Sequence, residues 1–122
     1  MRFVKTDNIV VNKSKSFAIR IIRLYKYLCD EKKEFVLSKQ VLRSGTSIGA
    51  NVKEAIRGQS KADFSAKMNI ALKEASETEY WLELLFETEF ISNQQFESIY
   101  EDSVELIKLL TSIVKSSRKE VE

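Results

Sequence analysis

The amino-acid sequence predicts an all-α protein that folds as an antiparallel up-down-up-down four-helix bundle. Proline is absent from the 122 residues and glycine occurs only three times, so the chain lacks the residues that most often interrupt helices. Charged residues make up 31% of the chain, a fraction typical of helices with solvated outer faces. Four amphipathic segments follow one another with short polar connections, which place neighbouring helices side by side. We therefore expect a single four-helix-bundle domain over residues 1–122.

The first helix is expected over residues 13–31. It is preceded by Asn and Ser residues between Asn12 and Ser16 that are suitable N-caps. Residues 1–11 show no sustained helical period, and we expect them to form an arm. The apolar positions of the helix share one face: Phe17, Ile21, Leu24, Tyr25 and Leu28.

The second helix is expected over residues 36–56 and contains the stretch LRSGTSIGANVKEA. Its glycines do not form a phosphate-binding loop, because GTSIG lacks the Lys-Ser/Thr ending of a P-loop and the spacing of a dinucleotide site. Two glycines inside a helix cost about 2 kcal/mol relative to alanine, and packing must offset this. We expect Gly45 and Gly49 to let a neighbouring helix approach closely. The large side chains considered for the space opposite them are Phe64, Leu82 and Phe17.

The third helix is expected over residues 60–88, with Ser60 as N-cap and Asp63 at the capping-box position. One arc of apolar residues faces the core, and a second stripe lies roughly 100–160° away around the helix. This second stripe fits either a helix placed between two neighbours or a subunit interface anchored by a tryptophan. The interface candidates are Ile70, Glu77, Trp81 and Leu84.

The fourth helix is expected over residues 93–117, capped by Ser92 or Asn93. It carries a long apolar stripe that ends near Lys115, and the charged residues beyond that point are expected to fray. No internal repeat or linker indicates a second domain.

The composition excludes most catalytic chemistries. Histidine is absent and Cys29 is the only cysteine, which removes His-based acid–base catalysis, Cys-His nucleophiles, disulfides and the usual zinc sites. A di-iron bundle would need Glu-x-x-His pairs, so Glu74 and Glu77 are more consistent with surface or interface ion pairs. We expect no enzymatic activity, no metal and no cofactor. Without a signal peptide or a run of about 18 apolar residues, we expect a cytoplasmic protein with no membrane association.

The two halves of the chain carry opposite charge. Residues 1–61 hold 14 Lys and Arg against 5 Asp and Glu, a net charge of +9. Residues 62–122 hold 6 against 13, a net charge of −7. The two blocks either balance each other within the bundle or between subunits, or leave a basic surface for nucleic acid.

The outer face of the second helix is the candidate nucleic-acid surface. In a purely structural interpretation, this is a solvent-exposed face on which Glu54 forms an ion pair with a nearby Lys or Arg. Its functional interpretation is a basic ridge, extended by Lys13, Arg20 and Arg23, that contacts phosphates and reads shape more than sequence. The candidate residues are Lys39, Arg43, Lys53, Arg57, Lys61 and Lys67.

Two stretches, QVLRSGTSIGANVKEA and SKADFSAKMNIALKEASETEYWL, resemble the 23S rRNA intervening-sequence protein family. The first matches a Q-x-x-R-x-x-x-S-I-x-x-N-x-x-E pattern and the second an A-x-x-x-x-x-E-T pattern. The resemblance extends over nearly the whole chain, from SFAIRIIRLYKYL to ELIKLLTSIVKS. The matching residues are Gln40, Arg43, Ser47, Ile48, Asn51, Glu54, Ala71, Glu77 and Thr78.

The resemblance implies a small bacterial cytoplasmic four-helix-bundle protein with no known catalytic activity. A related branch, the accessory variability determinants of diversity-generating retroelements, forms homopentameric barrels that present basic surface to nucleic acid and associate with a reverse transcriptase. By this resemblance the expected partners are further copies of the chain in a pentamer, structured RNA or DNA, and a nucleic-acid-processing protein such as a reverse transcriptase. The alternative is a protein–protein interaction adaptor without nucleic-acid binding, in which the charge asymmetry serves subunit or partner contacts.

Overall fold

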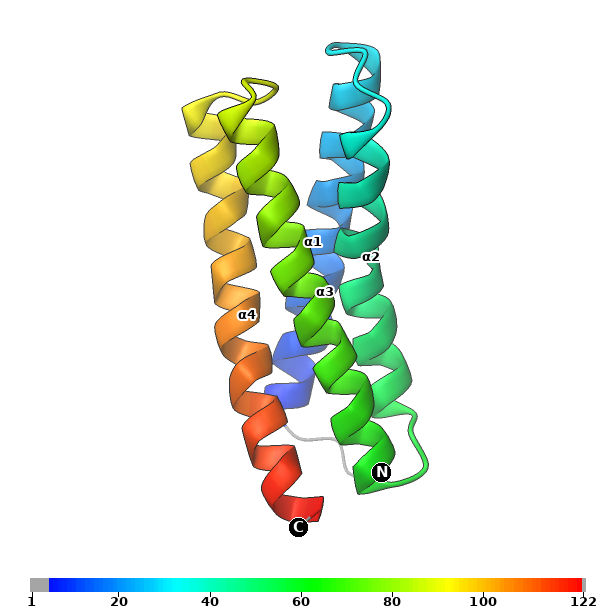
Figure 1. The fold of residues 1–122 in the computed structure, drawn as a ribbon. Coiled ribbons are helices and arrows are strands. Elements are labelled where there is room, and N and C mark those ends of the chain that lie inside the picture. The colour runs from blue at the N-terminus through cyan, green and yellow to red at the C-terminus, as the bar shows by residue number, and fades with distance from the viewer. Residues whose placement is uncertain (1–4, 122) are drawn as a thin grey trace.

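The computed structural model describes residues 5–121, with side chains from residue 9 onward. This part of the chain consists of four α-helices and contains no strand: α1 (Lys5–Asp30), α2 (Leu37–Ile56), α3 (Lys61–Glu87) and α4 (Asn93–Val121). The connections at residues 31–36 and 88–92 lie at one end of the molecule, and the connection at residues 57–60 lies at the other end (Figure 1).

Helix α1 begins eight residues earlier than the residue 13 expected from the sequence. The prediction that residues 1–11 form an arm is therefore wrong for residues 5–11, and its first four positions lie outside the described residues. The side chain of Val10 is fully buried, which explains the difference. Burial of this valine outweighs the weak helix propensity of the β-branched residues around it.

The remaining helix bounds lie close to those expected. Helices α2 and α3 agree to within one residue at each end, and α4 continues four residues beyond residue 117. Ser60 caps α3, since its Oγ accepts a hydrogen bond from the N–H of Asp63 at 3.0 Å. Ser92 caps α4 in the same way, accepting from the N–H of Gln95 at 3.1 Å, while the Gln95 side chain accepts from the N–H of Ser92.

Helix α2 begins without a side-chain cap at its own N-cap residue, Val36. The carboxylate of Glu34 takes this role from the preceding connection, because it accepts the N–H groups of Val36, Leu37 and Ser38 at 2.7–3.2 Å. Burial acts to raise the pKa of Glu34, but these backbone hydrogen bonds outweigh it and the pKa lies below its ordinary value. The connection is thereby fixed while Phe35 and Val36 remain exposed.

The core lies along the central axis and receives side chains from all four helices. Its fully buried large residues include Phe17, Ile21, Leu28, Val41, Ile48, Met68, Leu82, Leu85 and Leu110. The pairs α1–α2, α2–α3 and α3–α4 pack closely along their lengths, whereas α1 and α4 approach each other much less. Helices α1 and α3 therefore lie diagonally across the molecule, with α3 in front of α1 in Figure 1.

Buried hydroxyl groups join the packed pairs of helices. Ser44 of α2 and Thr78 of α3 are hydrogen-bonded at 2.8 Å, and Ser65 of α3 and Ser117 of α4 at 3.0 Å. Within residues 9–121, every buried side-chain nitrogen or oxygen has a hydrogen-bond partner. Each of these pairs fixes how one helix is rotated against its neighbour.

Helices α3 and α4 meet through aromatic rings near the 88–92 connection. Phe86 and Phe96 stack with their ring centroids 4.4 Å apart, and Phe96 contacts Tyr100 at 4.6 Å. The Tyr100 hydroxyl donates to the carboxylate of Glu83 at 2.9 Å. This hydrogen bond, aided by burial, raises the pKa of Tyr100 to about 12.

Candidate nucleic-acid and subunit interfaces

The two glycines of α2 face α1. A Cβ atom added to Gly45 would lie 2.7 Å from Cγ1 of Ile21, and one added to Gly49 would lie 3.4 Å from Oγ of Ser14. An approach too close for a side chain thus occurs at Gly45, whereas a Cβ atom at Gly49 would make an ordinary contact. The large side chain opposite Gly45 is Ile21, however, and not Phe64, Leu82 or Phe17, because α1 and α2 meet at a level that the sequence does not specify.

Arg43 lies on the outer side of α2 but extends towards α3. Its guanidinium forms ion pairs with Glu74, at 3.0 Å, and with Glu77. The hydrogen bond to Glu74, with a further contribution from Glu77, raises the pKa of Arg43. The basic ridge expected along α2 is therefore not continuous, because two carboxylates compensate the charge of Arg43 near its middle.

Four other candidate cations lie towards the ends of α2 and at the start of α3. Lys39, Lys53, Arg57 and Lys61 are exposed, and among residues 9–121 none of them takes part in an ion pair. Lys67 forms an ion pair with Glu54, with Nζ and Oε1 3.4 Å apart, as the structural interpretation of this face predicts.

An open depression lies where α2 meets α3 through the 57–60 connection. Among its lining residues are the cations Lys53, Arg57 and Lys67, and the carboxylates Glu54 and Asp63. The exposed Lys61 directly follows the Ser60 cap at its rim. The N-terminus of α3 adds the partial positive charge of its free N–H groups to the same place.

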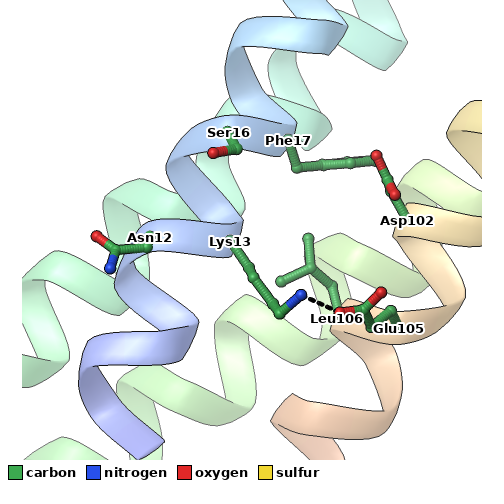
Figure 2. A pocket seen from close by; sticks show the side chains of 7 residues that line it. All are labelled: Asn12, Lys13, Ser16, Phe17, Asp102, Glu105 and Leu106. Atoms are coloured by element: carbon green, nitrogen blue, oxygen red, sulfur yellow. Dashed lines mark hydrogen bonds and ion pairs between the residues drawn. The ribbon is translucent and has the colours of Figure 1, made fainter. Parts of the chain in front are cut away.

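The ridge does not extend onto α1 through Lys13 and Arg20, contrary to the sequence-based expectation. Lys13 pairs with Glu105, and Arg20 pairs with Asp102 and donates to Ser98 of α4. Figure 2 shows Lys13 directed across a small cavity towards Glu105, with Asp102 on the same wall. These cations bridge the weakly packed α1–α4 pair and lie on a different side of the molecule from the α2–α3 depression.

The outer face of α3 presents apolar side chains to solvent. Ile70 is 41% exposed and Tyr80 is 53% exposed, while Trp81 and Leu84 are partly buried. The Trp81 indole N–H donates to Glu77 at 3.1 Å, and its ring centroid lies 5.3 Å from that of Tyr80. The carboxylate of Glu77 therefore serves both Arg43 and Trp81, and it joins the two candidate surfaces.

Tyr80 was not among the interface residues identified from the sequence. At 100° per residue it lies about 40° from Leu84, so the projection that selected Leu84 also contained Tyr80. Among the side chains of residues 9–121, no group of three or more His, Cys, Asp or Glu is arranged to hold a metal ion. Likewise, none of the described helices combines the length and apolar character that a membrane crossing requires.

Within the described residues, these features define a small all-helical protein with a basic α2–α3 end and exposed apolar side chains on α3. The model of the 23S rRNA-intervening sequence protein family matches residues 6–112, and the chain belongs to this family. The two motif stretches that carry the resemblance meet in space, since Arg43 contacts Glu77 and Ser44 contacts Thr78.

A solved structure with the same fold is a protein of unknown function from the S23 ribosomal protein family of Bacteroides thetaiotaomicron. The two chains are 64% identical, with a TM-score of 0.89, and the match covers 90% of this chain and 98% of the other. No curated protein matches the chain.

Proposed function

We propose that the protein is a non-enzymatic, cytoplasmic homo-oligomer that binds structured nucleic acid through the basic α2–α3 depression. The observation that carries this proposal is the exposure of Lys53, Arg57 and Lys61 around one depression without an ion pair among the described residues. A cation whose charge is already compensated gains little from a phosphate, whereas these three keep their full electrostatic attraction.

The proposed surface would contact phosphates at two separate places. Lys39 lies 18 residues before Arg57, the C-cap residue of α2, which corresponds to about 27 Å along a helix axis. Between them, Arg43 is compensated by Glu74 and Glu77. No aromatic side chain lines the depression, so the proposed binding would recognise the backbone and shape of the nucleic acid with low sequence specificity.

In this proposal the four helices of each chain form an antiparallel up-down-up-down bundle. Several chains assemble into a ring-like oligomer, and the family resemblance favours a pentamer. Alternation of the three connections between the two ends supports the antiparallel arrangement. Repetition of one depression around a ring would multiply weak phosphate contacts through avidity.

The test is the salt dependence of binding to a structured RNA and to duplex DNA. For duplex DNA, the logarithm of the affinity should fall against the logarithm of the salt concentration with a slope near −0.9 per neutralised phosphate. The variant Lys53→Glu/Arg57→Glu/Lys61→Glu should lose most of the affinity and flatten this slope. Lys108→Glu, an exposed cation on α4, and Arg43→Gln, whose charge is already compensated, are matched controls and should retain most of the binding.

Absent or salt-insensitive binding would overturn the nucleic-acid proposal. The second candidate, a protein–protein interaction adaptor, is favoured by a different observation, namely the exposure of Ile70 and Tyr80 on α3. A protein that assembles through this face but binds neither nucleic acid would support the adaptor.

A further inference from the structure

A cavity of about 390 Å³ lies at the end of the molecule that holds the 31–36 and 88–92 connections (Figure 1). This volume is within the range of small-molecule sites in proteins. The α2–α3 depression lies at the other end of α3, whose 27 residues correspond to about 40 Å along a helix axis. The residues that line this loop-end cavity include Tyr27, Lys32, Phe86, Glu89, Phe90 and Gln95.

Three aromatic side chains form the apolar part of the cavity wall. Tyr27, Phe86 and Phe90 come from the end of α1, the end of α3 and the 88–92 connection, and all three are half-buried. Phe86 is held in place by its stacking on Phe96, with the ring centroids 4.4 Å apart. The cavity therefore offers aromatic rings against which a planar ligand can stack.

Glu89 brings a carboxylate to the cavity at a cost in backbone energy. It follows the C-cap residue Thr88 with a φ of 67°, a left-handed conformation that glycine usually fills at this position. The N–H of Phe90 donates to the carbonyl of Leu85 at 2.9 Å, as in a Schellman motif. The Glu89 side chain is exposed and forms no ion pair within residues 9–121. Since glycine would end α3 with less strain, the carboxylate is better explained by contact with a ligand.

The cavity also offers hydrogen-bond donors. Lys32 Nζ lies 6.0 Å from the ring centroid of Tyr27, at the outer limit of a cation–π contact, and forms no ion pair within residues 9–121. The Oε1 atom of Gln95 accepts the N–H of Ser92 at 2.8 Å, which leaves the amino group of Gln95 as a donor. The lining residues thus carry one ammonium group and one carboxylate, and their charges cancel.

These groups select the chemistry of the ligand. A simple anion would be repelled by Glu89, a metal ion would be repelled by Lys32, and an apolar molecule would remove water from both charges without replacing it. A nucleobase has flat faces for the aromatic rings and an edge that carries both donors and acceptors. In guanine, O6 accepts from a donor such as Lys32, while N1–H and the N2 amino group donate to a carboxylate. We propose that the loop-end cavity binds one unpaired nucleobase, and that Lys32 and Glu89 select guanine.

Unpaired bases are the parts of a structured RNA that aromatic side chains can reach. The loop-end cavity would therefore add base recognition to a protein whose basic depression contacts phosphates at the other end of α3. The assignment of the base to a nucleic acid rests on the proposed function, whereas binding of the base itself does not.

The test follows the backbone amide signals of the protein by NMR during addition of guanosine monophosphate. The amides of residues 88–95 should shift in a saturable way. Ribose 5-phosphate, which lacks the base, should leave them unchanged, and the adenosine and uridine monophosphates should bind more weakly. Glu89→Gly should bind guanosine monophosphate roughly tenfold more weakly, the usual effect of one lost base contact. Its melting temperature should nevertheless rise, because glycine relieves the left-handed backbone, so a folding defect would not explain the loss.

Lys33→Gly is the matched control. Lys33 also has a left-handed backbone, with a φ of 54°, and lies in the neighbouring connection without lining the cavity. This variant should gain stability in the same way and keep the wild-type affinity for guanosine monophosphate.

The outcomes separate failure of this site from failure of the proposed function. Absent shifts, equal shifts with ribose 5-phosphate, or an unchanged affinity in Glu89→Gly would overturn the base site, and equal affinity for the three nucleotides would overturn the selection of guanine. Lys53→Glu/Arg57→Glu/Lys61→Glu should lose duplex binding and retain the shifts with guanosine monophosphate. A wild type that binds this nucleotide but no duplex overturns the proposed function alone, and the reverse result overturns the base site alone.

Discussion

Arg43 of α2 and Glu77 of α3 form an ion pair across the two helices, and the same carboxylate accepts the indole N–H of Trp81. A cation that the sequence alone placed on a nucleic-acid surface is thereby bound to residues placed on a subunit interface. Glu74 accepts a second hydrogen bond from the same guanidinium at 3.0 Å. The Glu77 side chain therefore connects the candidate nucleic-acid surface with the candidate subunit interface. Because Arg43 is already ion-paired, its substitution is expected to change the stability of the fold more than the binding of nucleic acid.

Arg43→Met should lower the free energy of unfolding by about 0.5–1 kcal/mol, because it removes two partly exposed ion pairs and leaves Glu74 and Glu77 without their cation. The difference from wild type should shrink as salt is added. Urea unfolding at low and high ionic strength measures both effects. Lys39→Met, on the same face of α2 but without an ion pair among the described residues, should have little effect; equal losses for the two variants would contradict the assignment.

Gly45→Ala should destabilise the protein by about 1–3 kcal/mol, although alanine favours a helix. The new methyl group would lie 2.7 Å from Cγ1 and 2.8 Å from Cγ2 of Ile21, a β-branched side chain with little rotamer freedom. Thermal or urea unfolding measures the loss. The loss caused by Gly45→Ala should be smaller in an Ile21→Ala background, because that substitution removes both of the contacting γ-carbons.

Gly49→Ala provides the matched comparison within the same helix. Its added methyl group would meet Ser14 at 3.4 Å, an ordinary contact distance. The gain in helix propensity of about 1 kcal/mol should then offset or exceed any strain. If Gly45→Ala proved as well tolerated as Gly49→Ala, the close approach of Ile21 would not limit the packing of α1 against α2.

Thr78→Val should lower the free energy of unfolding by about 1–3 kcal/mol, because it keeps the shape of the side chain but removes the partner of the buried Ser44 hydroxyl. The double variant Ser44→Ala/Thr78→Val should lose less than the sum of the single variants, since no hydroxyl is then left unpaired. A strictly additive cycle, measured by urea unfolding, would show that the two hydroxyls contribute independently.

Glu34→Gln should be less stable than wild type at neutral pH by up to about 1 kcal/mol, the usual size of an N-terminal cap. The folded protein lowers the pKa of Glu34 through hydrogen bonds from the N–H groups of Val36, Leu37 and Ser38 that outweigh burial. The contribution of the charged carboxylate is therefore present above the ordinary glutamate pKa of about 4.3 and is lost as the pH falls through the lower folded value. Unfolding measured from pH 7 downwards should show the two proteins converging in acid; a constant difference would contradict the charged cap.

Periodicity and capping residues were sufficient to predict three helices closely. Ser60 and Ser92 mark their helices because a hydroxyl cap acts within three residues of itself. The start of α1 was missed because residues near Ile9 and Val11 disfavour helices locally, and only the tertiary burial of Val10 decides in favour of one. The cap of α2 was missed because Glu34 acts from outside the helix.

The candidate surfaces were predicted less completely than the helices. Projection around one helix separates inner from outer positions, and it places Lys39, Arg43 and Arg57 together on the outer side of α2, with Lys53 at the edge. It does not give the rotation and level of α3 against α2, which decide that Glu74 and Glu77 reach Arg43 and leave Arg57 exposed. Tertiary placement, and not residue type, therefore selects which cations stay uncompensated.

The loose approach of α1 to α4 has a consequence for how the protein opens in its native state. Helix α1 is packed closely against α2 alone, and its exposed ion pairs to α4 add only modest stability. Local unfolding tends to release the element that buries the least apolar surface against its neighbours. Backbone amides in α1 should therefore exchange with solvent deuterium at lower free energies than those in α3, and α2 to α4 would persist as the slowest-exchanging unit.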